Sequence, residues 1–232
     1  ESIKVNIIGT KNIADLSMEY NVEKFLFVST DKAVNPTNIM GASKRVSELY
    51  IHHLNKYKKT EYIITRFGNV LGSSGSVIPT FIKNINENRN ICITHKDIIR
   101  YFMSIPEAAQ LVIKAVTIGI GGQTLLFDMG QPVKILDLAE NLLNMTASNR
   151  NITIEIIGLR PGEKLYEELL CKSEEILPTL EDKIMILKQN GDEDIDFINK
   201  YNWLVNNYED MDNDEIKMHL KNIVLDYIYN NE

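Results

Sequence analysis

The sequence predicts an α/β fold whose sheet is built mainly from parallel strands. Predicted strands lie at residues 25–28, 61–67 and 124–128, and the first of them is a continuous apolar run. A continuous run of this kind is typical of a strand that is buried on both faces of a parallel sheet. Segments with helical periodicity lie between these strands, as expected for an α/β protein.

The run at residues 25–28 changes abruptly to polar residues: Ser29, Thr30, Asp31 and Lys32. In open α/β sheets, ligands bind beyond the carboxyl ends of the strands. A helix is then expected to carry Met40, Lys44 and Glu48, and the first two share one face because they are four residues apart. A purely structural loop does not need Thr-Asp-Lys at a strand terminus, so we interpret this stretch as a candidate active site rather than as incidental polar residues.

This layout resembles the active site of short-chain dehydrogenases/reductases, in which a serine is followed by a loop and then by an aromatic residue four positions before a lysine. Ser29 and Lys44 match the serine and the lysine of that layout. Met40 stands where that layout has tyrosine. The string STDKAVNPTNIMGASKR resembles the polysaccharide-biosynthesis branch of the extended subfamily, whose members are UDP-N-acetylglucosamine 4,6-dehydratases that often carry this methionine. The resemblance implies a partial Rossmann-like parallel sheet over residues 1–75, which carries the catalytic signature. It also implies a smaller C-terminal α+β substrate-binding region over residues 76–232, with segments that return to the core sheet and with a helical tail.

Composition indicates an ordinary globular chain. It has 232 residues, of which 44% are hydrophobic and 25% charged, and a net charge of −7 that argues against nucleic acid as a partner. Cys92 and Cys171 are far apart, which favours a reducing, cytoplasmic setting. There is no apolar stretch of about 18 residues and no signal peptide. We predict no metal site, because His95 has no second ligand at metal spacing.

The first residues are expected to form an amphipathic helix over residues 3–20. No strand and no glycine-rich turn precede it, although such a unit would seat the pyrophosphate of a dinucleotide. The segment from Asn6 to Asn12 resembles the N-x-x-G-T-x-N helix that follows the nucleotide-binding unit in the family. We therefore expect the C-terminal portion of a longer enzyme, whose parent could be anchored at the inner membrane by an N-terminal region.

Further elements follow in order along the chain. We expect helices over residues 77–86, 106–118 and 135–144, and short strands at residues 91–94, 98–103 and 152–157. The glycines at 119–122 lack a preceding strand and are interpreted as a helix C-cap. The acidic, Asn-rich tail is expected to form two weak helices, over residues 194–201 and 214–229, with Trp203 packed between them.

The resemblance also implies the ligands of a UDP-sugar. Asn69 lies in a loop that matches R-F-G-N-V-x-G-S-x-G-S-V-I-P, although composition alone favours a flexible turn there. Arg100 in RYFM is expected to face the diphosphate, with a surface ion pair as the alternative. In LRPGEKLYEEL, Arg160 is expected to bind a phosphate and Glu163 a ribose diol.

The implied reaction assigns a role to each residue of the signature. Thr30 binds the C4 oxygen, Asp31 protonates the departing C6 hydroxyl, and Lys32 is the base at C5. Lys44 binds the nicotinamide ribose of NAD, which is preferred to NADP, and Asn6 and Ser29 complete the cofactor side. Met40 has no ionisable proton, so Asp31 or a water molecule must accept the C4 proton.

Three functions remain open at this stage. The first is a 4,6-dehydratase; the second is a UDP-sugar 4-epimerase, for which the Thr-Asp-Lys group would be surplus; the third is a non-catalytic UDP-sugar-binding module.

By resemblance we also expect a homodimer or higher homo-oligomer, formed through the helices at residues 3–20 and 41–57. Retention or inversion at C5 and the downstream sugar are not predicted.

Overall fold

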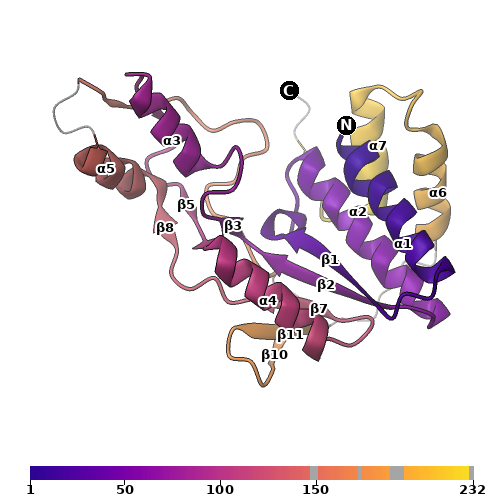
Figure 1. The fold of residues 1–232 in the computed structure, drawn as a ribbon. Helices are drawn as coiled ribbons and strands as arrows, with labels where there is room; N and C mark the ends of the chain where they lie inside the picture. Colours follow the sequence, from indigo (N-terminus) through magenta and orange to yellow (C-terminus); the bar gives the residue numbers. More distant parts are fainter. Residues whose placement is uncertain (147–150, 172–173, 189–195, 230–232) are drawn as a thin grey trace. The chain divides into compact units, whose positions relative to one another are not determined.

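The computed structural model describes residues 1–146, 151–171, 174–188 and 196–229, which form two compact units. The first unit comprises residues 1–67, 111–128 and 168–232, and the second comprises residues 68–110 and 129–167. The chain therefore crosses from one unit to the other four times. Each unit is described separately below (Figure 1).

A five-stranded sheet forms the centre of the first unit, in the order β1-β2-β7-β11-β10. The strands are β1 (Lys24–Thr30), β2 (Glu61–Phe67), β7 (Thr124–Phe127), β10 (Glu175–Pro178) and β11 (Ile184–Lys188). β1, β2 and β7 are parallel, whereas β11 and β10 are antiparallel additions. The expected α/β class with a parallel sheet is confirmed, and β2 has the expected bounds.

β1 departs from the expectation of a strand buried on both faces. Phe27 is buried in the main core, but Val28 is 44% exposed. Successive side chains of a strand point to opposite faces, so Val28 lies on the face opposite Phe27 and Ser29, and that face is left partly open; β1 also pairs only with β2 among the described strands and forms an edge of the sheet. The apolar run identified a strand but could not show where in the sheet that strand lies.

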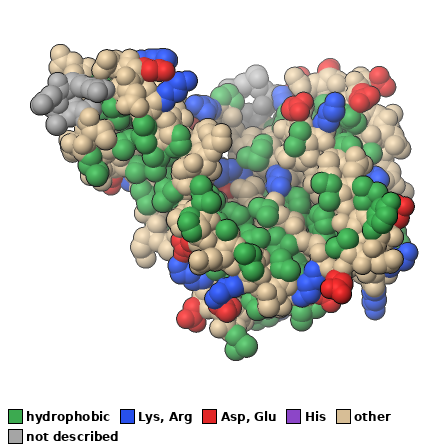
Figure 2. Space-filling model, in the orientation of Figure 1, with side chains coloured by type: hydrophobic (Ala, Val, Ile, Leu, Met, Phe, Trp, Pro, Cys, Tyr) green, Lys and Arg blue, Asp and Glu red, His purple; other side chains and the backbone are tan. Residues whose placement is uncertain are grey.

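The N-terminal helix consists of a π-helical turn, η1 (Ile3–Ile8), followed by α1 (Gly9–Glu19). Its inner face is buried through Ile3, Ile7 and Ala14. Its outer face exposes an apolar stripe made of Val5, Ile13, Leu16 and Tyr20. In Figure 2, hydrophobic side chains are visible on the face over α1.

The C-terminal helices α6 (Phe197–Asn207) and α7 (Asn213–Ile223) pack beside α1 and α2 (Ile39–Leu54) in the same unit (Figure 1). Tyr50 of α2 stacks on Tyr201 of α6 with ring centroids 4.4 Å apart. Leu204 and Leu220 join the same core. The chain's own tail therefore covers part of α2 that was expected to contact a second copy.

Trp203 was expected to pack between the two tail helices. It stacks on His219 of α7, with ring centroids 4.0 Å apart, but remains 45% exposed. Trp203 therefore contacts α7 at the surface of the two tail helices and not within the core between them. The first residues of the expected helix at 194–201 lie outside the described part of the chain.

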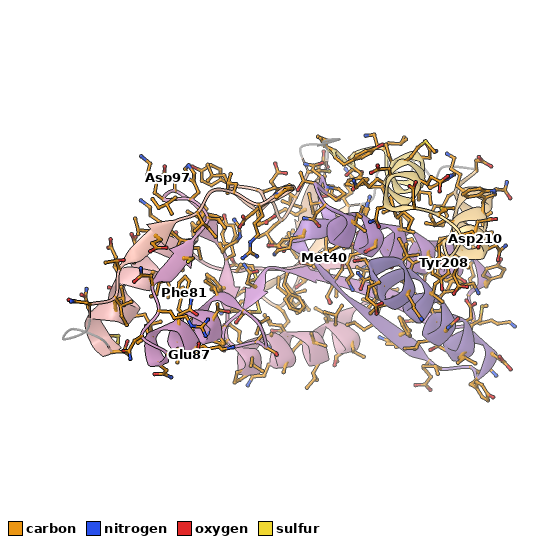
Figure 3. All side chains as sticks on the ribbon, turned by 90° about the horizontal axis from the view of Figure 1, so that it is seen from above. Met40, Phe81, Glu87, Asp97, Tyr208 and Asp210 are labelled. Carbon is orange, nitrogen blue, oxygen red and sulfur yellow. The ribbon has the colours of Figure 1, made fainter. Side chains whose placement is uncertain are left out.

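The second unit is built from two-stranded pairings and two helices, α3 (Val77–Asn86) and α5 (Ile135–Thr146). The pairings are β3 (Asn69–Val70) with β6 (Phe102–Met103), β4 (Ile91–Ile93) with β9 (Ile154–Ile156), and β5 (Ile99–Arg100) with β8 (Val133–Lys134). Its apolar core includes Phe81, which Figure 3 labels on α3. α4 (Ile105–Ile118) runs from this unit into the first.

The strand expected at residues 98–103 is divided into β5 and β6. β5 pairs antiparallel with β8, whereas β6 pairs parallel with β3. The carbonyl of Tyr101, between the two, accepts hydrogen bonds from the backbone N–H and the side chain of Asn69. Residues 98–103 therefore pair with two different strands, which their composition did not indicate.

Candidate functional site

The polar residues that follow β1 form a hydrogen-bonded group in the first unit. Asp31 begins the short helix η2 (Asp31–Ala33) and is completely buried. Its Oδ1 accepts hydrogen bonds from Thr30 Oγ1 at 2.7 Å and from Lys32 Nζ at 2.8 Å. Its Oδ2 is also buried and has no hydrogen-bond partner among the described residues. One carboxylate oxygen is therefore held by the neighbouring side chains, and the other is available to a further donor or acceptor.

The first turn of α2 is packed directly against this group. Asn38 caps the helix by accepting a hydrogen bond from Gly41 N at 2.9 Å. A Cβ atom at Gly41 would lie 2.1 Å from the carbonyl oxygen of Lys32. Only glycine permits this approach, so the M-G-A-S-K sequence reflects a steric requirement of the site.

Lys44 lies one turn further along α2, on the face it shares with Met40. Its Nζ donates to Val28 O at 2.7 Å and lies 4.0 Å from the centre of the Phe27 ring. Burial lowers the pKa of Lys44, and the nearby Glu48 carboxylate opposes that shift. Met40 is 39% exposed at the start of α2 (Figure 3). The lysine ammonium is thereby fixed at the carboxyl end of β1, with an apolar side chain beside it on the helix.

The two residues assigned to the cofactor side, Asn6 and Ser29, contact or approach the signature helix. Asn6 Nδ2 donates to Ser43 Oγ at 2.9 Å, and Ser47 Oγ donates to Asn6 O at 2.7 Å. Ser29 is buried, and its hydroxyl oxygen has no hydrogen-bond partner among the described residues. In the structure, Asn6 joins the N-terminal helix to α2.

A buried ion pair supports this part of the site, and the sequence reading missed it. Arg66 of β2 donates through Nε and Nη2 to the two carboxylate oxygens of Glu48 on α2, at 2.8 and 2.6 Å. Both side chains are at most 1% exposed. Arg45 and Glu174 extend the network, at 2.8 Å to Glu48 and 3.0 Å to Arg66. The available signal was an arginine inside the apolar run of β2 together with a glutamate four residues after Lys44.

The Glu48 carboxylate stays ionised in this dry setting. Burial alone would raise its pKa, but the charge and hydrogen bonds of Arg66, with help from Arg45, hold the pKa of Glu48 well below its ordinary value. The stability that this provides is present above the unfolded-state pKa of about 4.3. It is lost as the pH falls below that value.

The residues assigned to the sugar nucleotide lie in the second unit. Arg100 is buried and contacts Glu163, with 3.5 Å between Nη2 and Oε1. Asn69 Nδ2 donates to Tyr101 O at 3.2 Å. Arg160 is exposed, and its guanidinium has no recorded partner within the described ranges. The structure thus brings Arg100 and Glu163 together and leaves Arg160 open to solvent.

The fold and the polar strand end define a Rossmann-like α/β protein of the extended short-chain dehydrogenase/reductase type. The structure of Pen from Bacillus thuringiensis superposes with a TM-score of 0.75 at 32% identity, over 88% of this chain and 68% of that one. A dTDP-glucose 4,6-dehydratase from Bacillus anthracis, in complex with NAD, shares the fold with a TM-score of 0.60 at 18% identity, over 68% of this chain and 58% of the other.

The chain belongs to the polysaccharide biosynthesis protein family, whose model matches residues 1–189. It is 52% identical to the capsular polysaccharide biosynthesis protein CapD of Staphylococcus aureus, over 75% of this chain and 29% of that protein. An uncharacterized membrane protein of Methanocaldococcus jannaschii is 40% identical, over 96% of this chain and 69% of its own length. A UDP-glucose 4-epimerase of Rickettsia bellii is 36% identical, over 75% of this chain and 51% of that protein. Within the described residues, no helix is long and apolar enough to cross a membrane.

We predict that Arg66→Met destabilises the chain by about 3–5 kcal/mol, because it leaves the Glu48 carboxylate buried without its partner. The free energy of unfolding, measured with urea, checks this. The matched control is Lys114→Met, which breaks the exposed ion pair with Glu181 in the same unit and should cost less than about 1 kcal/mol.

The double variant Arg66→Met/Glu48→Met should recover much of the loss, since no charge is then left buried. It should also lack the decrease in stability below about pH 4 that Glu48 contributes in the unmodified chain. If Arg66→Met costs no more than Lys114→Met, the buried pair does not constrain the fold.

Proposed function

We propose that this chain forms the catalytic and substrate-binding part of a nucleotide-sugar 4,6-dehydratase in surface polysaccharide biosynthesis. Its substrate would be UDP-N-acetylglucosamine and its product UDP-2-acetamido-2,6-dideoxy-4-hexulose. The observation that carries the proposal is the Thr30-Asp31-Lys32 group, in which a buried carboxylate and an amine lie within hydrogen-bond distance. Family membership and the relative named for capsular polysaccharide biosynthesis support the pathway.

Removal of water across C5 and C6 needs an acid and a base in one site. The C5 proton becomes acidic only next to a C4 carbonyl, and NAD would supply the chemistry that oxidises C4 and later reduces C6. Lys44 and Ser29 would hold the nicotinamide ribose, and the position of the Lys44 ammonium at the carboxyl end of β1 fits that role.

The hydrogen bond from Thr30 to Asp31 suggests a route for the C4 proton, which Met40 cannot accept. Thr30 would take the proton from the C4 hydroxyl and pass its own to Asp31 Oδ1, 2.7 Å away. Asp31 would then donate that proton to the departing C6 oxygen. Lys32, as a neutral amine, would take the C5 proton and return it to C5. Thr30 keeps the proton from C4, and the proton that Thr30 gave to Asp31 leaves in the water, so Thr30, Asp31 and Lys32 end in the protonation states in which they began.

A second candidate is a UDP-sugar 4-epimerase, which the Rickettsia bellii relative favours by its name. Epimerisation requires oxidation and reduction at C4 alone. It has no use for a paired acid and base at C5 and C6, and this favours the dehydratase. Within the described residues neither Cys92 nor Cys171 forms a disulfide, which is compatible with the reducing, cytoplasmic setting that we propose.

The catalytic prediction concerns a protein that joins this chain to an NAD-binding half. Asp31→Asn keeps the shape of the side chain but removes the acid, so formation of the 4-keto product should fall by about 10²-fold or more. Lys32→Met should abolish deuterium incorporation at C5 from heavy water. Met40→Leu is the matched control and should be mild, because both side chains are apolar and similar in volume.

Two results would contradict this assignment. Continued C5 exchange in Lys32→Met would place the base elsewhere. A protein that interconverts C4 epimers without losing water would be the epimerase.

A separate prediction concerns ligand binding by the chain itself. Because it supplies the predicted UDP ligands Asn69, Arg100, Arg160 and Glu163 but no glycine-rich turn, it should bind UDP more tightly than NAD in calorimetry. Arg160→Met should weaken UDP binding about tenfold, the loss expected for one charge-assisted hydrogen bond. Micromolar NAD binding without a UDP response would overturn this division of ligands.

We also propose that the chain forms a homodimer through the apolar stripe of α1, since the tail covers part of α2. Ile13→Asp, at a position that is 61% exposed, should shift the chain to monomer in light scattering at tens of micromolar. Ile120→Asp, also 61% exposed but outside the stripe, is the control and should leave the mass unchanged. If the unmodified chain is itself a monomer under these conditions, the proposal of a homodimer is wrong.

A further inference from the structure

The last described turn of the tail lies against the loop that joins η2 to α2. Beyond α7, the backbone N–H of Ile228 donates to the carbonyl oxygen of Pro36 at 2.9 Å. Val224 and Tyr227 are at most 2% exposed and belong to the core that α2 shares with the tail helices. Residues 224–229, which we call the strap, are therefore anchored by buried side chains and reach the loop through a main-chain hydrogen bond.

Pro36 connects this hydrogen bond to Lys32 through close packing. Pro36 is buried, and a Cβ atom at Gly41 would lie 3.2 Å from the Cβ of Pro36 and 2.1 Å from the carbonyl oxygen of Lys32. The strap, the loop, the first turn of α2 and the candidate site are thus in continuous contact, with no room for a methyl group at Gly41. Protein interiors packed this closely transmit displacement from one group to the next.

The backbone of the loop also needs support from elsewhere in the chain. Asn35 has φ +41°, in the left-handed region that asparagine tolerates better than most residues. Its Nδ2 donates to Glu168 Oε2 at 3.0 Å. The hydrogen bond from Ile228 holds the next residue, Pro36, from a segment about 190 residues later. Two neighbouring loop residues are therefore held by two separate long-range contacts.

The two contacts differ in their relation to the family. The family model matches residues 1–189, so it includes Glu168 but not the strap. The support that the strap gives to the loop is therefore a property of this chain's tail, which the family signature at residues 29–44 does not predict.

We propose that the strap is a positioning element of the candidate active site, in which the N–H of Ile228 holds Pro36 against Gly41 and thereby fixes Lys32 and its neighbours. The strap contacts neither substrate nor cofactor and acts only through the loop. The statement about the loop rests on the contacts above, whereas its consequence for catalysis rests on the proposed function.

The first test measures the loop in the chain itself. Ile228→Pro removes the donor, whereas Ile228→Ala removes a side chain that is 61% exposed and keeps the N–H. Amide hydrogen exchange of Val34 and Gly41 reports the loop, because these groups donate to Asp31 O at 3.0 Å and to Asn38 Oδ1 at 2.9 Å. Ile228→Pro should speed both by about fivefold, the effect of losing one hydrogen bond, and Ile228→Ala should match the unmodified chain.

A second variant removes the donor without the conformational limits of proline, which restricts its own φ and the residue before it. An ester in place of the amide between Tyr227 and Ile228 replaces the N–H by oxygen and keeps both side chains. The Val224 amide, which donates to Leu220 O at 2.8 Å at the end of α7, shows whether the tail stays packed. Unchanged loop exchange in a variant whose tail stays packed overturns the proposal.

The second test distinguishes positioning from simple stabilisation, in the protein joined to an NAD-binding half. Ile228→Pro should lower kcat for the 4-keto product about tenfold or more, because small displacements of reacting groups are costly. KM should stay within about twofold, since the residues assigned to the sugar nucleotide lie outside the loop. Ile228→Ala should keep both values.

Two outcomes of the second test have different meanings. Faster loop exchange with unchanged kcat would show that the strap only stabilises the fold, and the proposal would be wrong. If the unmodified joined protein forms no 4-keto product, the proposed function is wrong, while the exchange experiment still decides whether the strap holds the loop.

Discussion

The geometry of the candidate site depends on the buried pair between Glu48 and Arg66. A bidentate contact between a planar guanidinium and a carboxylate fixes both distance and orientation. It therefore sets the rotation of α2 about its axis as well as its distance from β2. Lys44 lies one turn before Glu48 on that helix, so its ammonium is placed at the end of β1 by a contact deeper in the core. Burying two charges is costly unless the pairing is this complete.

A steric constraint acts at the other end of the same helix. Gly41 lets the first turn of α2 touch the carbonyl of Lys32, so the helix and the Thr30-Asp31-Lys32 group cannot move independently. The ion pair and this backbone contact together hold the signature helix at both ends of its functional stretch. Asp31, Lys32 and Lys44 are consequently parts of one rigid arrangement within the first unit.

Local patterns predicted the elements whose signal lies within a short window. β2 and α3 have the expected bounds because an apolar run and an amphipathic repeat define them. β10 and β11 were missed, since their place in the sheet depends on pairing with β7, about 60 residues earlier. Arg100 shows the same limit at the site: its residue type suits phosphate, but the carbonyls and carboxylates that occupy it come from residues more than sixty positions later. Arg66 was passed over because a charge inside an apolar strand can be judged only when its partner is known.

The packing of the tail on α2 has a consequence for the order in which the protein can fold during synthesis. Tyr50, Ile51 and Leu54 belong to a core that also needs Tyr201 and Leu204, about 150 residues later. At about 5–20 residues per second, the ribosome would leave that apolar face uncovered for on the order of 10 s after α2 emerges. Contacts between residues so far apart in the sequence form slowly, and the hydrophobic surface of α2 stays exposed until they form. The nascent chain is therefore a natural client for a chaperone that shields α2 until the last two helices arrive.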